Sequence, residues 1–457
     1  MSLRCLRSST GTTRPDFAGC LGYNRFMKRL KHLGILLVVL AVMSCAVLAI
    51  PGVRERVLWH LQQWSIQARY TFRPPEKQVF VPQSTVDTII QATQTALAMA
   101  NTPTIEPTLT FTLPPESPTL TPTPLPTPLP VQVTLSGVKY FDQHGLWNYC
   151  APANLAMALS FWGWNGDRTD VGKWVKPFEK DKNVMPYELA DYVQEQTNLS
   201  VVLRSGGTLD LLKRLIAGGF PVLVEKGAYM QDISGKVSWM GHYAVVTGYD
   251  DSQQRFITQD SFYQANYPVS YSDLEQGWRA FNFVFLVVYP PEREVEVMAL
   301  LGPYTDATQA LTIALNRATS ETAQLEGASR FFAWYNRGTS LVGLQDYLGA
   351  AGAYDEAFRV YAELPEKERP WRMLWYQTGP YFAYFYSGRY ADVNNLATQT
   401  IEAASEPYIE ESFYWRAKAR QAMGDWDGAV NDLRTSLEYH PGFQPSLAAL
   451  SDMGVSP

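Results

Sequence analysis

The sequence predicts an α+β domain followed by an all-α domain of helical repeats, with a transmembrane helix near the N-terminus. The chain of 457 residues is longer than one hydrophobic core usually serves, which favours two folded domains. Strand-like apolar runs mix with helical patterns over residues 135–298, whereas residues 303–457 show helical spacing throughout. An uninterrupted apolar segment at residues 34–50 is long enough to cross a bilayer.

The apolar segment at residues 34–50 sets the expected location of the chain. Basic residues precede it closely, which predicts that residues 1–33 are cytoplasmic and that the domains after it face outward. We therefore expect a single-pass protein of the bacterial cell membrane, with extracytoplasmic C-terminal domains and the membrane as a partner. A cleaved secretory signal, lipid modification at Cys45 and a translation start at Met27 stay open as alternatives.

Two segments of low sequence complexity or weak pattern follow the apolar run. Residues 51–101 are expected to form a stalk, and residues 102–132 a linker in which Thr and Pro alternate almost without charge. Pro removes backbone donors and favours the extended polyproline II conformation, so the linker is predicted to be a semi-rigid spacer without a packed core.

Charge and cysteine content narrow the function. The net charge of −6 and the lack of a Lys/Arg-rich tract exclude nucleic acid as a partner, because phosphate neutralisation needs a basic patch. Three of the four cysteines lie within or before the apolar segment, so Cys150 would be the single thiol of the exported part. A lone thiol in an oxidising compartment is a liability unless it reacts usefully, which marks Cys150 as a functional candidate.

Cys150 lies where a loop containing Gly and Asn leads into an apolar-periodic run from Ala153 to Trp162. This pattern predicts a helix with Cys150 in its first turn. Unpaired backbone N–H groups and the positive end of the helix dipole stabilise a thiolate at that position. Cys150 is therefore the predicted nucleophile.

Two predicted strands supply the partners that a nucleophilic thiol needs. The segment Gly241–Asp250 reads as a buried strand with His242 near its start, and the next strand ends at Asp260. Adjacent strands would place His242 beside Asp260, as the base and the group that orients it. Gln143, seven residues before Cys150, is a candidate to stabilise an oxyanion together with the Cys150 backbone N–H.

The blocks that contain these residues, FDQ, NYCAPANLA, GGFPVLV, GHYAVVTGYD and ITQDSF, resemble the C39-like peptidase family, a branch of the papain-like fold. The resemblance implies a papain-like domain whose cysteine peptidase activity hydrolyses peptide or protein substrates through a thioester acyl-enzyme. It implies Cys150 as nucleophile, His242 as general base and acid, and Asp260 as the orienting group. Gln143 would belong to the oxyanion hole.

Several features limit this resemblance or leave alternatives open. Ala151 follows the nucleophile where the family usually has Gly, which would narrow the approach to the scissile carbonyl. His144 is a possible substitute base, and Asp260 could serve a strand-end turn instead. No cluster has metal-ligand spacing and no phosphate-binding loop is present, so we expect neither a metal nor another cofactor. The alternative function is a catalytically idle papain-like scaffold that binds peptides.

The C-terminal region resembles tetratricopeptide repeats. Its small and aromatic positions recur after three similar tripeptides, Gln345-Asp346-Tyr347, Gly388-Arg389-Tyr390 and Gly424-Asp425-Trp426. Successive aromatic residues are 43 and 36 positions apart, compared with roughly 34 in an ideal repeat. We expect three repeats with flanking helices at 306–322 and 445–452. The array would bind a protein or peptide partner, or brace the peptidase domain.

Overall fold

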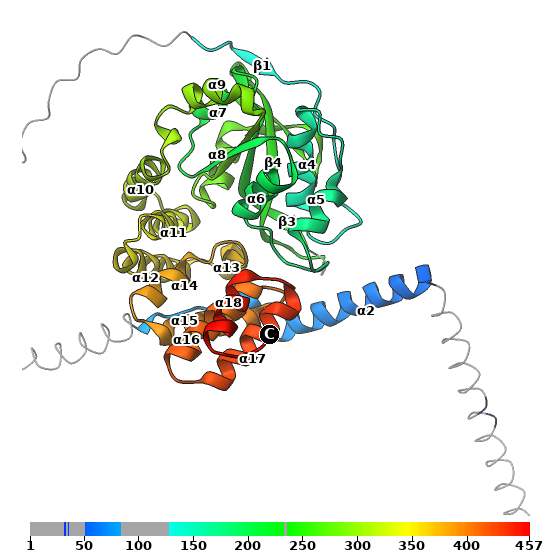
Figure 1. Cartoon of the computed structure of the whole chain (residues 1–457), viewed down its shortest axis with the longest axis vertical. Coiled ribbons are helices and arrows are strands. Elements are labelled where there is room, and N and C mark those ends of the chain that lie inside the picture. Colours follow the sequence, from blue (N-terminus) through cyan, green and yellow to red (C-terminus); the bar gives the residue numbers. More distant parts are fainter. Residues whose placement is uncertain (1–31, 33–34, 36–50, 84–127, 233–234) are drawn as a thin grey trace, which may run out of the picture. The chain divides into compact units, whose positions relative to one another are not determined.

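The computed structural model describes residues 32, 35, 51–83, 128–232 and 235–457. Two compact units are present, Met1–Arg69 and Tyr70–Pro457, and each is described by itself. The second unit contains all of the sheet, the candidate site and the C-terminal helices (Figure 1). The Thr/Pro-rich linker lies outside the described residues, except for residues 128–132.

The predicted transmembrane helix and the single-pass membrane location are corrected here. Within the described residues, every helix is either too short or too polar to span a bilayer. Of the predicted span 34–50, all residues but Ile35 lie outside the described part of the chain. The helix that follows, α2 (Pro51–Phe72), is long enough, but Arg54, His60 and several Gln residues make it polar.

Strands of the second unit form one antiparallel sheet of seven members within the described residues, in the order β2-β7-β3-β4-β5-β6, with β1 paired to β4. The strands are β1 (Gln132–Thr134), β2 (Ser200–Arg204), β3 (Val222–Gln231), β4 (Val237–Asp250), β5 (Arg255–Asp260), β6 (Gln264–Ser270) and β7 (Phe285–Tyr289). β4 is central and almost entirely buried, which explains its near-continuous apolar sequence. Lys226 of β3 is the register partner of His242 in β4.

Helices cover both faces of this sheet (Figure 1). α4 and α6 share one apolar core with strand residues of β3, β4 and β7, while α7, α8 and α9 share the other. The helices and 3-10 turns of this region are α4 (Cys150–Phe161), α5 (Arg168–Val175), α6 (Pro186–Gln196), α7 (Leu209–Ala217), α8 (Tyr271–Arg279), η2 (Pro291–Arg293), α9 (Glu294–Leu301) and η3 (Gly302–Thr305). This α+β architecture agrees with the predicted fold class.

α4 is the innermost helix of the α+β region. Every residue from Ala151 to Ser160 is buried, so the helix has no polar face. Its small Ala residues allow close packing against β4 and α5. The position of its first residue, Cys150, is therefore fixed by a helix that is packed on all sides.

The C-terminal region is helical, as predicted. Its elements are α10 (Ala307–Gln324), α11 (Gly327–Gly343), α12 (Tyr347–Glu363), η4 (Glu366–Glu368), α13 (Met373–Tyr376), α14 (Gly379–Tyr386), α15 (Tyr390–Ala403), α16 (Glu410–Ala422), α17 (Trp426–Tyr439) and α18 (Gln444–Asp452). α10 and α18 occupy the segments where flanking helices were expected. The short η1 (Pro75–Lys77) precedes Phe80, whose side chain is buried in the core of this region.

The helical region packs directly on the sheet region. One apolar core contains Trp239 of β4 and Phe281 together with aromatic residues of α11 and α12. The Trp239 ring stacks with Phe281 and with Phe332, at centroid distances of 5.9 Å in both cases. Arg372 adds a buried ion pair of 2.7 Å to Asp232 and a hydrogen bond to the Trp239 carbonyl. The helices therefore brace the β3–β4 hairpin.

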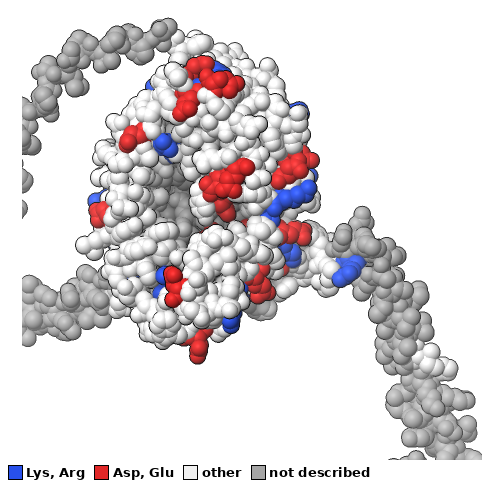
Figure 2. Space-filling model, in the orientation of Figure 1, with Lys and Arg blue, Asp and Glu red and all other residues white. Residues whose placement is uncertain are grey.

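On the face shown in Figure 2, acidic side chains form the larger charged groups, whereas Lys and Arg are mostly scattered. This distribution follows from the net charge of −6. Negative charge spread over a surface keeps a protein soluble and repels acidic partners.

Candidate active site

Cys150 is the first residue of α4 and is partly exposed. The residue two positions earlier, Asn148, has a φ of 50°, a left-handed conformation that Asn tolerates well. Its side-chain amide donates to the Asp181 carbonyl at 2.6 Å, which fixes the chain just before the nucleophile. Backbone N–H groups in the first turn have no acceptor within the helix, and Pro152 has none to offer. The Cys150 N–H, as part of this first turn, has no acceptor within the helix.

His242 and Asp260 lie side by side on β4 and β5, as predicted. His242 Nε2 and Asp260 Oδ1 are 2.7 Å apart, and both side chains are completely buried. Asp260 Oδ1 also accepts the backbone N–H groups of Phe262 at 3.1 Å and Tyr263 at 3.3 Å. These bonds hold the carboxylate in one orientation, and the carboxylate in turn orients the imidazole.

The charges of this pair are set by mutual attraction. Burial alone would lower the pKa of His242, but the Asp260 carboxylate and the nearby Cys150 raise it to about 9. Burial also opposes ionisation of Asp260, yet His242 and then Lys226 hold the pKa of this carboxyl well below its usual range. The second ring nitrogen, His242 Nδ1, is buried and has no conventional hydrogen-bond partner among the described residues. Cys150 contributes to the raised pKa of His242, so the thiol lies near the ring.

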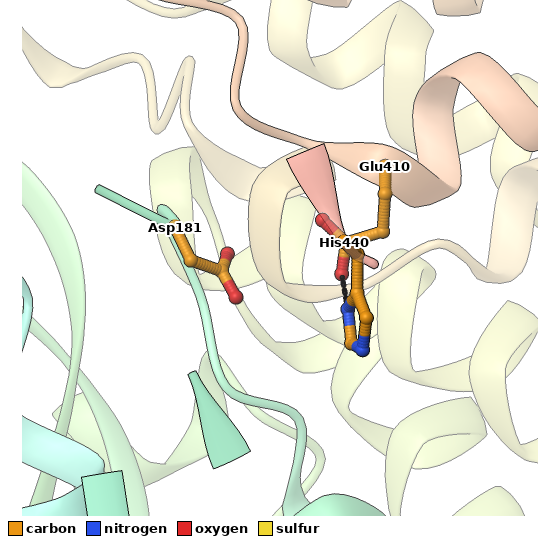
Figure 3. A group of neighbouring side chains, drawn as sticks. All are labelled: Asp181, Glu410 and His440. Atoms are coloured by element: carbon orange, nitrogen blue, oxygen red, sulfur yellow. Dashed lines mark hydrogen bonds and ion pairs between the residues drawn. The ribbon is translucent and has the colours of Figure 1, made fainter. Parts of the chain in front are cut away.

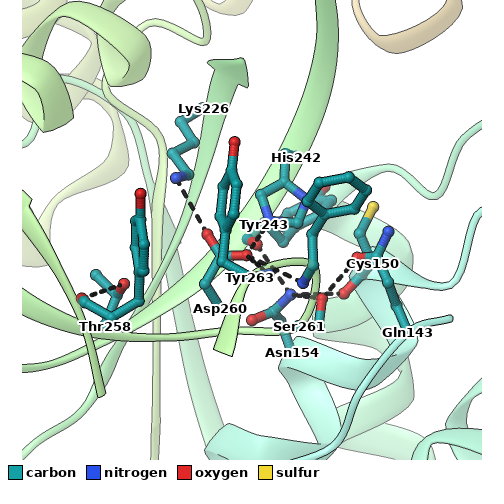
Figure 4. A network of polar contacts seen from close by, with 12 residues as sticks. Gln143, Cys150, Asn154, Lys226, His242, Tyr243, Thr258, Asp260, Ser261 and Tyr263 are labelled. Carbon is teal, nitrogen blue, oxygen red and sulfur yellow. Dashed lines mark hydrogen bonds and ion pairs between the residues drawn. The ribbon is translucent and has the colours of Figure 1, made fainter. Parts of the chain in front are cut away.

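Lys226 is a member of the site that the sequence interpretation missed. Its Nζ lies 3.2 Å from Asp260 Oδ2, on the oxygen that His242 leaves free. The Asp260 carboxylate therefore accepts hydrogen bonds from both Lys226 and His242 (Figure 4). Two adjacent charged residues, Glu225 and Lys226, interrupt an otherwise apolar strand, and this interruption was the available sequence signal.

A chain of hydrogen bonds positions Gln143. Asn154 Nδ2 donates to Ser261 Oγ at 2.8 Å, and Ser261 Oγ donates to Gln143 Oε1 at 2.7 Å. The Gln143 backbone N–H also donates to the Ser261 carbonyl at 3.0 Å. Because its oxygen is engaged by Ser261, the Gln143 amide nitrogen points toward the Cys150 side (Figure 4). Neither Ser261 nor Asn154 was singled out from the sequence.

One pocket brings the candidate residues together. It is lined by Gln143, Asn148, Cys150, Ala151, Lys182, Asn183, Val184, Glu225, Met230, Met240, Gly241, His242, Tyr243 and Tyr376. Tyr376 comes from α13, so the helical region supplies part of the pocket wall. Burial, followed by the nearby Cys150, raises the pKa of Glu225 well above its ordinary value.

His144, the substitute base weighed from the sequence, does not line this pocket. Its side chain is 56% exposed, and its Nδ1 is 2.6 Å from Asp142 Oδ1. Its ring packs at 5.1 Å from the Phe262 ring. The structure therefore assigns the position beside the thiol to His242 and leaves His144 at the surface.

Residues 135–285 match the model of the Peptidase_C39 like family, which confirms the predicted resemblance for this region. A solved structure described as that of a putative C39-like peptidase from Bacillus anthracis is 18% identical, with a TM-score of 0.29. That match covers 34% of this chain and 96% of the other. No curated protein matches the chain. The α+β region is thus papain-like in fold, and the family match supports a peptidase.

Proposed function

We propose that the chain is a cysteine peptidase of the C39-like type that hydrolyses peptide bonds through Cys150, His242 and Asp260. The observation that supports this most is the 2.7 Å contact between His242 Nε2 and Asp260 Oδ1, in a pocket that Cys150 also lines. The contact orients the imidazole and leaves Nδ1 for the sulfur, which is the arrangement that an activated thiol requires.

In the proposed reaction, the Cys150 thiol transfers its proton to His242 and the thiolate attacks the scissile carbonyl carbon. The tetrahedral intermediate collapses when the imidazolium gives its proton to the leaving amine, and a thioester acyl-enzyme forms. Water then attacks the thioester with His242 as base, which releases the acid product and restores the thiol. Asp260 stays ionised throughout and stabilises the imidazolium.

Gln143 is the proposed side-chain donor to the oxyanion. Its Nε2 and the Cys150 backbone N–H would both donate to the oxygen that becomes negative in the intermediate. The bond from Ser261 Oγ to Gln143 Oε1 supports this role, because it fixes the direction of the amide before a substrate binds. A donor oriented in advance costs no reorganisation during the reaction.

Peptides and proteins are the proposed substrates. Apolar side chains of Val184, Met230, Met240 and Tyr376 form much of the pocket wall beside the nucleophile. This apolar wall favours an apolar side chain on the substrate next to the scissile bond.

The helical region is proposed to be a tetratricopeptide-like array that completes the substrate pocket and offers a surface for a protein partner. Tyr347, Tyr390 and Trp426 each begin the second helix of a pair, which is the place of the aromatic residue in such repeats. Tyr376 in the pocket supports the first role. The exposed aromatic Trp426 is a candidate contact for the second.

Cleavage of a mixed peptide library by the purified full chain tests the proposed activity. We expect cleavage by the wild type and its loss, by about three orders of magnitude or more, in Cys150→Ala and His242→Ala. His144→Ala is the matched control, because it removes an exposed histidine of the same region and should leave the rate unchanged.

A different result would favour the catalytically idle scaffold. In that case the wild type would cleave no peptide, and peptides would bind equally to the wild type and to Cys150→Ala. Equal activity of the wild type and His242→Ala would instead exclude His242 as the base.

A further inference from the structure

Asp181, Glu410 and His440 meet at the seam between the α+β region and the helical region (Figure 3). One ligand atom from each lies within 4.8 Å of the other two. Glu410 begins α16, His440 follows α17, and Asp181 belongs to the loop before α6. His440 Nδ1 is 2.9 Å from Glu410 Oε1, and the Asp181 carboxylate points toward this pair in Figure 3.

The carboxyl groups at this position are buried and lie close to one another. Asp181 and Glu410 are each only 2% exposed, and Glu411 is buried beside them. Burial, and then the neighbouring carboxylates of Glu411, Asp181 and Glu188, raise the pKa of Glu410 well above its ordinary value. The dipole of α16 stabilises negative charge at its N-terminus, where Glu410 lies. Asp181 lies in a loop and has no helix of its own to stabilise its charge.

Cations near the group only partly balance it. Lys176 and Lys182 are the basic groups that act on Asp181. Burial lowers the pKa of both lysines to about 8, and Lys182 Nζ also lies 3.9 Å from the Glu406 carboxylate. Two lysines therefore face at least three buried carboxyl groups.

Two buried oxygens at the group have no hydrogen-bond partner among the described residues, Glu410 Oε2 and Asn183 Oδ1. Asn183 lies between the acidic residues: its backbone N–H donates to Asp181 Oδ1 at 3.2 Å, and its amide nitrogen contacts Glu411 Oε1 at 3.5 Å. A buried carboxylate oxygen and a buried amide oxygen without partners are costly unless something else satisfies them. Both atoms are of the type that binds a cation.

We propose that Asp181, Glu410 and His440 bind one divalent cation of the Zn²⁺ or Mn²⁺ type. Two carboxylates and one imidazole form a mixed oxygen and nitrogen donor set, which suits these ions better than Ca²⁺ or Mg²⁺. The ligands come from positions 181, 410 and 440, so no local spacing in the sequence could reveal the group.

The cation would act on the candidate active site by positioning. The Asp181 carbonyl accepts the Asn148 amide at 2.6 Å, two residues before Cys150. Lys182, Asn183 and Val184 follow Asp181 directly and line the pocket. A cation that ties Asp181 to α16 and α17 would therefore fix one wall of the pocket and the chain that leads into α4. The reacting atoms lie elsewhere, so the cation has no catalytic step of its own.

Calorimetric titration of the untagged full chain with ZnCl₂, MnCl₂ and CaCl₂, after treatment with a chelator, tests the proposal. A background in which Cys5, Cys20, Cys45 and Cys150 are all replaced by Ala removes the thiols as competing zinc ligands. We expect one Zn²⁺ or Mn²⁺ per chain and a concentration-dependent rise in Tm. Glu410→Gln and His440→Asn should each weaken binding by at least about tenfold. Asp427→Asn, which removes an exposed carboxylate from α17, should bind as the parent does.

Glu410→Gln keeps the shape of the side chain and removes a charge, so its Tm without metal should equal or exceed that of the parent. The proposal is overturned if neither Zn²⁺ nor Mn²⁺ binds, if Ca²⁺ binds more tightly than both, or if binding survives Glu410→Gln and His440→Asn. Because these readouts do not use peptide cleavage, they are independent of the proposed peptidase activity.

Discussion

At the scale of single residues, the candidate site depends on side chains that orient other side chains. Asp260 orients His242, and Ser261 orients Gln143. Cys150, His242, Asp260 and Gln143 were all candidates from the sequence, because a nucleophilic thiol needs a base, a group that orients the base and an oxyanion donor. The sequence did not indicate a role for Lys226, Ser261 or Asn154. The role of a buried Lys, Ser or Asn depends on its hydrogen-bond partner, which only the structure identifies.

Ser261→Ala tests whether Ser261 positions Gln143. The change removes the hydrogen bond of 2.7 Å to Gln143 Oε1 and frees the amide to rotate. We expect Ser261→Ala to lower kcat about tenfold with little change in KM. Gln143→Ala, which removes the donor itself, should lower kcat about 10²-fold. Ser252→Ala, at an exposed turn, is the control. If Ser261→Ala lowered only the stability and left kcat unchanged, the positioning role would be wrong.

The pKa of His242 predicts how stability depends on pH. It is raised from 6.5 to about 9 in the folded chain, so folding favours the protonated form. This contribution is complete below about pH 6.5 and is lost as pH rises through about 9, and its order of magnitude is 3 kcal/mol. Urea unfolding at pH 6.5 and pH 9.5 should show the loss in the wild type and a flatter dependence in His242→Gln. Equal slopes in the two proteins would contradict the assignment.

At the scale of elements, α4, β4 and β5 were predictable because each has a strong periodic pattern and a clear start. The turns before α12, α15 and α17 share a left-handed backbone residue, which the sequence pattern of the tripeptides indicated only at the two Gly positions. Gln345, Gly388 and Gly424 each lie two residues before the aromatic residue and have φ angles of 64°, 79° and 87°. Gly adopts this left-handed conformation without strain, whereas the Cβ of Gln lies too close to the following carbonyl oxygen.

Gln345→Gly is therefore expected to stabilise the chain by about 1 kcal/mol, because it relieves the left-handed strain at a turn that already uses Gly at the equivalent positions. Chemical unfolding at fixed pH measures the change. Gly424→Gln is the reciprocal control and should destabilise by a similar amount. A destabilised Gln345→Gly variant would show that the Gln345 side chain makes a contribution larger than the strain.

At the scale of the whole molecule, the boundary near residue 300 separates two kinds of fold but not two independent bodies. Residues 70–457 form one compact unit, with Tyr376 of the helical region in the pocket of the α+β region. Sequence patterns report local periodicity, so they could not reveal this contact or the group formed by Asp181, Glu410 and His440. The predicted membrane span was wrong, because the described part of the chain contains no helix that is both long and apolar enough to cross a bilayer.

Tyr376→Ala tests the contribution of the helical region to specificity. The change removes an aromatic ring from the pocket wall and should let larger substrate side chains enter. We expect the ratio of kcat/KM for a bulky over a small side chain next to the scissile bond to rise about tenfold. Tyr386→Ala, which truncates an exposed aromatic residue of the same region, should leave the ratio unchanged.

The central claim is that Cys150 and His242 share one site and that the imidazole activates the thiol. The rate of Cys150 alkylation by iodoacetamide at pH 6, located by mass spectrometry in the full chain, measures this directly. We expect Cys150 to react at least about tenfold faster than an unstructured thiol, and we expect His242→Ala to abolish this difference and His144→Ala to keep it. Equal alkylation rates in the wild type and His242→Ala would contradict the account.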